Sequence, residues 1–219
     1  HEIIPARRTT TMITVWGGQT SRSLRVVWLL EEMGLPYRVR QVDMLAPEKD
    51  LAWLAVNPGD FLPAIQDGDV TMVESVAILE YLMGRYGPTP LQPKPGDPAF
   101  PAYQQFLHLG EAGLATLMMV PLVSGFIAPA AERDNWGARW ARGCVERRQI
   151  LVRRQLETAP YMAGDTFTAA DISVSYALRL GANHAGFPLT DAEQAYLART
   201  TARDAYQRAY ARSHEGVAA

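Results

Sequence analysis

Residues 62–86 read LPAIQDGDVTMVESVAILEYLMGRY, and this stretch decides the fold of the first part of the chain. Its first half has two short apolar runs on either side of Asp67-Gly68, a pair typical of a two-residue β-hairpin turn. Its second half has the spacing of an amphipathic helix that stops at Gly87-Pro88. The residues expected on the buried face of this helix are Ile78, Leu79, Leu82 and Tyr86. The stretch therefore predicts two strands followed by a helix.

A second group of elements is predicted before this stretch. The runs MITVW at 12–16 and YRVRQVD at 37–43 are β-branched or alternating, as strands are. Between them apolar residues recur at i, i+3, i+4 and i+7, which predicts a helix, and a shorter helix is expected around 47–55. The recurring residues are Val26, Leu29, Leu30 and Met33. The order βαβ followed by ββα predicts an α/β domain over residues 12–87.

A proline-rich segment separates this domain from a helical one. The segment GPTPLQPKPGDPAFP, at 87–101, holds six of the 15 prolines of the chain, so residues 88–101 are predicted to be a linker. Strand signals almost vanish over residues 102–219, where we expect an all-α domain. Two helix starts there carry capping boxes, Thr168 with Asp171 and Thr190 with Glu193. The apolar helices around Leu82 and Leu107 supply either core packing or a dimer face.

The charge pattern argues against nucleic-acid binding. The net charge of the 219 residues is -2, whereas nucleic-acid binding domains are usually basic. Seven arginines fall between Arg133 and Arg154, but they alternate with apolar positions of a predicted helix at 135–157. A solvated helix face explains them better than a nucleic-acid site.

The remaining composition excludes several other classes. One cysteine, Cys144, allows no disulfide, and the four histidines have no ligand-like spacing, so no metal site is expected. No uninterrupted apolar run of about 20 residues indicates a membrane span, and no leader resembles a signal peptide, so the cytosol is the expected compartment. Residues 1–11 show no period and are expected to be either added sequence or a poorly ordered tail.

Hydroxyl side chains gather where the first predicted helix begins. The approach is WGGQTSRS, with two glycines before Thr20, Ser21 and Ser23, in a loop that follows the first strand. One serine capping the helix would account for a lone hydroxyl, with a contribution of about 1 kcal/mol. A helix N-terminus also stabilises anions, and a hydroxyl donating to a thiolate there would lower the pKa of the thiol. The glycine-rich approach favours this second interpretation.

Two further motifs fit a peptide-like ligand. In NPGDFLPAI, Pro63 directly precedes a strand, so Leu62 would offer its N–H and C=O to an extended ligand backbone. The alternative is an ordinary trans proline that protects an edge strand. In VESVAIL, Ser75 would hold a ligand carboxylate and Glu74 would pair with an amine, although helix capping explains both equally well.

Taken together, these motifs make the chain resemble a cytosolic glutathione S-transferase. The resemblance covers residues 12 to about 213 and rests on the order of SRSLRVVWLLEEMGLPY, NPGDFLPAI, VESVAILEYL, the proline-rich linker and FTAADISV. It implies a thioredoxin-like N-terminal domain that binds glutathione and an all-α domain that forms much of the second-substrate pocket. It also implies a homodimer that acts on a small electrophile without a metal.

The resemblance assigns roles to particular residues. Ser21 becomes the activating hydroxyl of a serine-type member, theta- or zeta-like or bacterial, with Thr20 and Ser23 as alternates. Trp16 stands about where other classes have a catalytic tyrosine, and Arg22 where cysteine-type members have their thiol. The resemblance assigns glutathione binding to Leu62, Pro63, Glu74 and Ser75, and the second-substrate pocket to Trp16, Met118 and Met119. Core filling is the alternative for the two methionines.

Three functions follow, in order of preference. The first is a transferase in which glutathione thiolate attacks a small hydrophobic electrophile, as in detoxification. The second keeps glutathione but isomerises a double bond or removes a halide. The third is a non-catalytic binding protein with the same fold, which is disfavoured because the hydroxyl cluster and the Glu-Ser pair are both retained.

Overall fold

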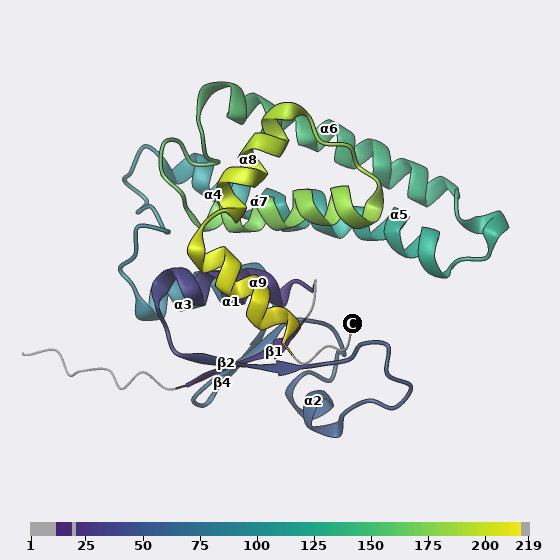
Figure 1. The fold of residues 1–219 in the computed structure, drawn as a ribbon, viewed down its shortest axis with the longest axis horizontal. Coiled ribbons are helices and arrows are strands. Elements are labelled where there is room, and N and C mark those ends of the chain that lie inside the picture. The colour runs from purple at the N-terminus through teal and green to yellow at the C-terminus, as the bar shows by residue number, and fades with distance from the viewer. Residues whose placement is uncertain (1–11, 19–20, 216–219) are drawn as a thin grey trace, which may run out of the picture. The chain divides into compact units, whose positions relative to one another are not determined.

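The computed structural model describes residues 12–18 and 21–215, so the segment 1–11 and Thr20 lie outside the described residues. The chain divides into two units (Figure 1). One contains the residues up to 78 together with those from 208 onward, and the other contains residues 79–207.

The first unit is built on a four-stranded mixed sheet. Its strands are β1 (Ile13–Gly17), β2 (Tyr37–Gln41), β3 (Ala64–Asp67) and β4 (Val70–Val73), in the order β2-β1-β3-β4. Strand β1 is parallel to β2 and antiparallel to β3. The helices are α1 (Ser23–Met33), α2 (Leu51–Val56) and the start of α3 (Ser75–Tyr86). The predicted βαβ-ββα order of a thioredoxin-like domain is confirmed.

Strand β1 is buried on both of its faces because helices cover both sides of the sheet. Figure 1 shows α1 against one face and α2 on the other. The α2 residue Trp53 packs against Trp16 of β1, with ring centroids 5.9 Å apart. On the opposite face, Val26 and Leu30 of α1 are completely buried, as their helical spacing predicts. Helix α1 ends where Gly34 adopts a left-handed conformation, φ 64°, which glycine tolerates without steric cost.

The hairpin turn lies one residue later than predicted. Asp67 pairs with Val70, so Gly68 and Asp69 form the two-residue loop rather than Asp67 and Gly68. Gly68 has φ 60°, the positive value that the first central position of such a loop requires. Asp67 is instead the buried last residue of β3.

The second unit is helical, as expected for this part of the chain. Its elements are α4 (Phe100–His108), the π-helical η1 (Leu109–Ala115), α5 (Thr116–Ile127), the 3-10 turn η2 (Ala130–Glu132), α6 (Trp136–Thr158), α7 (Ala169–Leu180), the π-helical η3 (Gly181–Ala185), α8 (Asp191–Thr201) and the start of α9 (Asp204–His214). Helix α7 is buried along nearly all of its length and packs against α4 and η1, while α5 packs against α6. A methyl group on Gly110 of η1 would lie 2.6 Å from the Ser173 carbonyl carbon, so glycine permits η1 and α7 to approach closely.

Both predicted capping boxes are present. The Asp171 carboxylate accepts hydrogen bonds from the Thr168 amide and from the Met162 amide, each at 2.8 Å. Glu193 accepts from the Thr190 amide at 2.8 Å. Both acids are completely buried, so each fixes its helix start from inside the unit.

Several apolar positions are clarified by their burial. Leu82 and Leu107 are both fully buried and so belong to core packing, whereas Tyr86 is only partly buried, contrary to the prediction.

In the described part of the chain, one helical run, Phe100–Ile127, is long and apolar enough by length and composition to span a membrane. Core helices of soluble proteins reach the same values, so this run alone does not indicate a membrane protein.

Candidate functional site

A turn between β1 and α1 holds the first group of predicted site residues. Ser23, the first residue of α1, is fully buried, and its Oγ accepts a hydrogen bond from the Gly18 amide at 2.9 Å. A methyl group on Gly17 would overlap the Cβ and Oγ of Ser23. The Ser23 side chain therefore lies directly over the end of β1, where the missing side chain of Gly17 leaves room for it.

The hydroxyl groups of Ser21 and Ser23 are hydrogen-bonded to each other. Their Oγ atoms lie 2.7 Å apart, and either can donate. Ser21 Oγ also accepts from the Ser23 amide at 3.4 Å, while the Ser21 amide donates to the Gly18 carbonyl at 3.2 Å. Ser21 is partly exposed, in contrast to Ser23.

Helix capping explains only part of this arrangement, namely the hydrogen bond from the Ser23 amide to Ser21 Oγ. The N-cap position of α1 is Arg22, whose side chain makes no capping hydrogen bond. The serine hydroxyls bond mainly to each other and to the Gly18 amide in the preceding loop. The partial positive charge of the helix N-terminus thus lies beside a partly exposed hydroxyl, which suits stabilisation of an anion.

The second group lies at the same edge of the sheet. The Leu62-Pro63 bond is cis, and these residues directly precede β3, whose first residue Ala64 pairs with Trp16. Because β1 and β3 are antiparallel, Pro63 lies near the end of β1 that leads to Gly18. Pro63 is buried and Leu62 is partly exposed.

The loop before Leu62 is held by its own side chains. Asn57 donates to the Phe61 carbonyl at 2.6 Å and accepts from the Gly59 amide at 3.0 Å. Asp60 has φ 50° and accepts from Trp53 Nε1 at 2.8 Å. The hydrogen bond from Trp53 lowers the pKa of Asp60, and the hydrogen bond and charge of Lys49 act in the same direction. These contacts hold the loop that leads to Leu62 and Pro63.

The third group lies at the start of α3. Ser75 is its first residue and is buried, and its Oγ accepts a hydrogen bond from Arg25 Nη1 at 3.2 Å. Arg25 belongs to α1 and is fully buried. Glu74 is exposed and has φ 70°, a value uncommon for a residue other than glycine. Such backbone conformations cluster at functional sites.

The first turn of α1 connects these groups. Ser23 bonds to the loop after β1, and Arg25, two residues later, bonds to the start of α3. The sequence analysis did not identify Arg25. A single arginine within the apolar run SLRVVWLL indicates a buried charge that needs a hydrogen-bonding partner. The structure thus brings the serine pair, the Leu62-Pro63 bond and Ser75 together around one end of β1.

The residues expected to line a second-substrate pocket are mostly buried. Trp16 is 2% exposed, donates from Nε1 to Gln66 at 2.9 Å and lies in a cluster with Trp53 and Ala64. Met118 is fully buried against Gly181, whereas Met119 is partly exposed. Trp16 and Met118 therefore pack as core residues, and core filling was the alternative already open for Met118.

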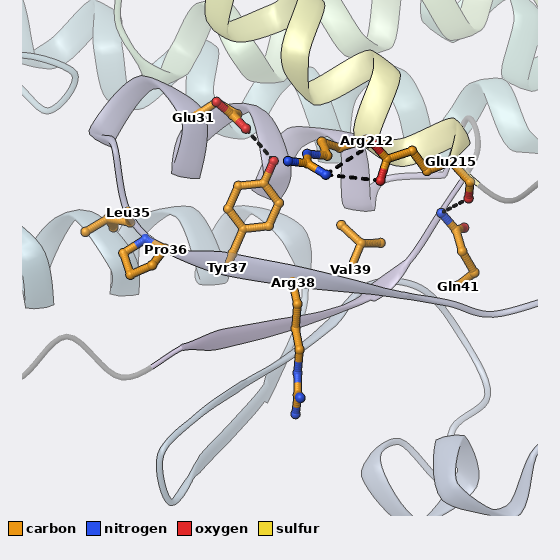
Figure 2. Close-up of a pocket in the computed structure, with 9 residues that line it drawn as sticks. All are labelled: Glu31, Leu35, Pro36, Tyr37, Arg38, Val39, Gln41, Arg212 and Glu215. Atoms are coloured by element: carbon orange, nitrogen blue, oxygen red, sulfur yellow. Dashed lines mark hydrogen bonds and ion pairs between the residues drawn. The ribbon is translucent and has the colours of Figure 1, made fainter.

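A surface cavity of about 600 Å³ lies elsewhere in the first unit (Figure 2). It runs beside β2 and is lined by Glu31, Leu35, Pro36, Tyr37, Arg38, Val39, Gln41, Arg212 and Glu215. Tyr37 donates to Glu31 at 2.5 Å, and burial together with this hydrogen bond raises the pKa of Tyr37. None of the predicted site residues lines this cavity.

Within residues 12–18 and 21–215, no group of three His, Cys, Asp or Glu side chains is placed to hold a metal ion.

Comparison with known proteins connects the first part of the chain to one family. Residues 11–84 match the family model for the N-terminal domain of glutathione S-transferases. Glutathione S-transferase 3 of Schizosaccharomyces pombe is 28% identical over 200 residues, which cover 86% of this chain and 77% of that protein.

Solved structures agree over nearly the whole chain. A glutathione S-transferase from Actinobacillus pleuropneumoniae is 27% identical and has a TM-score of 0.78, covering 92% of this chain and 93% of its own. A theta-class glutathione S-transferase from Xanthomonas axonopodis pv. citri, solved with glutathione bound, is 27% identical with a TM-score of 0.71, covering 90% of this chain and 96% of its own. The first part of the chain is therefore a glutathione S-transferase N-terminal domain, and the chain shares the fold of a solved glutathione S-transferase over 92% of its length.

Proposed function

We propose that the chain is a glutathione transferase in which the Ser21 hydroxyl donates to the thiolate of bound glutathione. The observation that carries this proposal is the 2.7 Å contact between the hydroxyl oxygens of Ser21 and Ser23. Ser23 Oγ already accepts the Gly18 amide, so its own hydrogen is available to Ser21. Ser21 then accepts from Ser23 and keeps its hydrogen for the ligand.

This direction of hydrogen bonding would stabilise an anionic sulfur. A hydroxyl that receives a hydrogen bond becomes a better donor, because hydrogen bonds in a chain polarise one another. The N-terminus of α1 adds its partial positive charge at the same point. Each unit by which the thiol pKa falls corresponds to about 1.4 kcal/mol in favour of the thiolate. A thiolate is the nucleophilic form of a thiol, so such a shift raises reactivity at neutral pH.

The rest of the tripeptide is assigned to the other two groups. The Leu62 backbone would pair with the cysteinyl part of glutathione, in the manner of an added strand. Ser75 would bind the γ-glutamyl carboxylate, and Glu74 the γ-glutamyl amine. The fully buried Arg25 supports this assignment, because its positive charge reaches the Ser75 hydroxyl.

The second substrate is proposed to be a small hydrophobic electrophile. Of the three residues expected around it, Met119 is the one that keeps exposed surface, so we assign Met119 to the pocket wall. Isomerisation or dehalogenation through a glutathione adduct is the second candidate, since both need the same activated thiol. Product analysis separates them: a stable thioether indicates transfer, whereas free glutathione with a rearranged substrate indicates isomerisation.

The decisive experiment is a titration of the thiolate absorbance of bound glutathione, for the native protein and for Ser21→Ala. We expect a bound-thiol pKa well below that of free glutathione, and a return toward the free value in Ser21→Ala. Thr20→Ala and Ser23→Ala are titrated alongside, because a lowered thiol pKa that Ser21→Ala leaves unchanged would assign the activation to one of these two hydroxyls. Binding of glutathione with an unshifted thiol pKa would instead favour the non-catalytic binding protein.

We also propose that two copies of the chain form a homodimer in the cytosol. Its support is a group of large apolar side chains left exposed on α5 and the first turns of α6. These are Val120, Val123, Phe126, Ile127, Trp136 and Trp140. Sedimentation velocity at several concentrations tests the dimer, and Phe126→Ser should weaken it if this surface forms the interface.

A further inference from the structure

Gln41 is the last residue of β2 and contacts the C-terminal end of the chain. Its Nε2 donates to the carbonyl oxygens of Ser213 and Glu215, each at 3.2 Å. The bond to Glu215 is drawn in Figure 2. Both N–H groups of the side-chain amide are thus used, which fixes the plane of the carboxamide.

The other end of the same carboxamide lies over the loop that carries the serine pair. A methyl group on Gly18 would overlap Gln41 Oε1 and lie 2.7 Å from its Cδ. Gly18 has φ 135°, so both its conformation and its surroundings require glycine. Gln41 also pairs with Gly17 in the β1–β2 ladder, so its backbone is as firmly placed as its side chain.

Gly18 in turn holds both serines. Its amide donates to Ser23 Oγ at 2.9 Å, and its carbonyl accepts the Ser21 amide at 3.2 Å. A displacement of Gly18 would therefore move both hydroxyl groups. The contacts form a continuous chain from the Ser213 and Glu215 carbonyls, through Gln41 and Gly18, to the Ser21–Ser23 pair.

Helix α9 has a second anchor in the same unit, nearer its middle. Arg208 donates to Glu31 of α1 at 2.6 Å. Since this ion pair lies at the other end of α1 from Ser23, it holds α9 without touching the serine loop. It therefore offers a matched control for contacts of α9 that do not pass through Gln41.

We propose that Gln41 is a positioning residue, which sets the geometry of the Ser21–Ser23 pair according to where the C-terminal end of α9 lies. The catalytic part of this inference rests on the proposed function, whereas the mechanical part does not. Loss of the two carbonyl contacts frees the carboxamide, Gly18 gains freedom, and the serine hydroxyls lose their fixed separation. The effect is on thiol activation rather than on glutathione affinity, because Leu62 and Ser75 are untouched.

The test compares Gln41→Met with Glu31→Gln. Methionine keeps the length and volume of glutamine but cannot donate to the two carbonyls. Glu31→Gln instead weakens the ion pair with Arg208 and alters the hydrogen bond with Tyr37, and it leaves the contacts of Gln41 in place. Hydrogen exchange of residues 17–23 in the ligand-free protein should increase several-fold in Gln41→Met and stay near the native rate in Glu31→Gln. Unchanged exchange in Gln41→Met overturns the proposal, whether or not the protein binds glutathione.

A second measurement tests the catalytic part. The pKa of the bound glutathione thiol should rise by roughly half a unit in Gln41→Met, with its dissociation constant changed less than about twofold. Increased hydrogen exchange with an unshifted thiol pKa would overturn the catalytic part of the proposal. It would still support the part in which Gln41 holds the serine loop in place. A native protein that shows no lowered thiol pKa would instead contradict the proposed function itself, so the two failures are distinguishable.

Discussion

The hydroxyl oxygens of Ser21 and Ser23 lie 2.7 Å apart, yet only Ser21 has exposed surface. Ser23 is enclosed between the end of β1 and its own helix, and it accepts the Gly18 amide. The two hydroxyls therefore differ: the buried one fixes the loop, and under the proposed function the partly exposed one would face the ligand.

This difference predicts different results for the two alanine variants. Ser21→Ala should raise the bound-thiol pKa by at least about one unit and change stability by less than about 1 kcal/mol, because a partly exposed group is lost. Ser23→Ala should also destabilise the protein by about 1–3 kcal/mol, because it leaves the Gly18 amide buried without its acceptor. Thiol titration and urea unfolding measure the two quantities. Equal stability losses would contradict the division of tasks.

Ser75 and Arg25 are expected to affect glutathione binding rather than the chemical step. Ser75→Ala should raise KM for glutathione about tenfold and leave kcat within about twofold, because its contact to the ligand carboxylate is the same in the ground and transition states. Arg25→Met should raise KM too, with an added loss of stability from the buried hydrogen bond. Arg38→Met is the control, since Arg38 bonds to Thr14 instead. Initial-rate kinetics decide, and a fall in kcat alone would contradict the assignment.

Two glycine substitutions should have opposite effects. Gly17→Ala places a methyl group on the Ser23 side chain, and we expect a loss of about 1–3 kcal/mol together with most of the thiol activation. Gly84→Ala lies in α3, where a methyl group meets no atom within 4 Å, so it should stabilise by about 0.5–1 kcal/mol. Unfolding midpoints in urea compare the two. A neutral Gly17→Ala would mean that the serine loop has more room than its contacts indicate.

Asp171 predicts a pH dependence of stability. Burial raises the pKa of Asp171 to about 6, although amides of Met162 and Thr168 and the Tyr196 hydroxyl favour its charged form. Between pH 4 and pH 6 the folded chain holds a proton that the unfolded chain has released. The stabilisation from this proton is therefore complete below about pH 4 and is lost as pH rises through 6, by roughly 3 kcal/mol.

The comparison with Asp171→Asn isolates this effect, because asparagine does not titrate. The difference in unfolding free energy between the native protein and Asp171→Asn should shift against the native protein as pH rises from 4 to 6, and level off above that. A difference that stays constant over this range would show that Asp171 titrates alike in the folded and unfolded chains.

The sequence predicted those parts of the structure that depend on neighbouring residues. Helical spacing, the alternating strands and both capping boxes are local patterns, and all are present. The hairpin was one residue out because Asp67-Gly68 and Gly68-Asp69 are both acceptable turn pairs, and only the pairing of Asp67 with Val70 separates them.

The rest depended on contacts between residues far apart in the chain. Arg25 meets Ser75 across 50 positions, and Gln41 meets Ser213 across 172, so no local pattern reveals either contact. Trp16 was expected beside a substrate because of its place in the family motif. Its ring is instead held in the core by contacts with Gln66 and Trp53. The alternation of residues along a strand does not show whether a buried face meets the core or a substrate.

The π-helical segment η1 has a consequence for the phase of the helices on either side of it. A π-helical turn holds about one residue more than an α-helical turn, so it rotates all later side chains by about 100° relative to a regular α-helix. Deleting one residue between Leu109 and Ala115 would restore the regular geometry but turn the residues of α5 away from α6. The length of this segment is therefore as constrained as its composition, and insertions or deletions are expected to be better tolerated in the proline-rich linker than here.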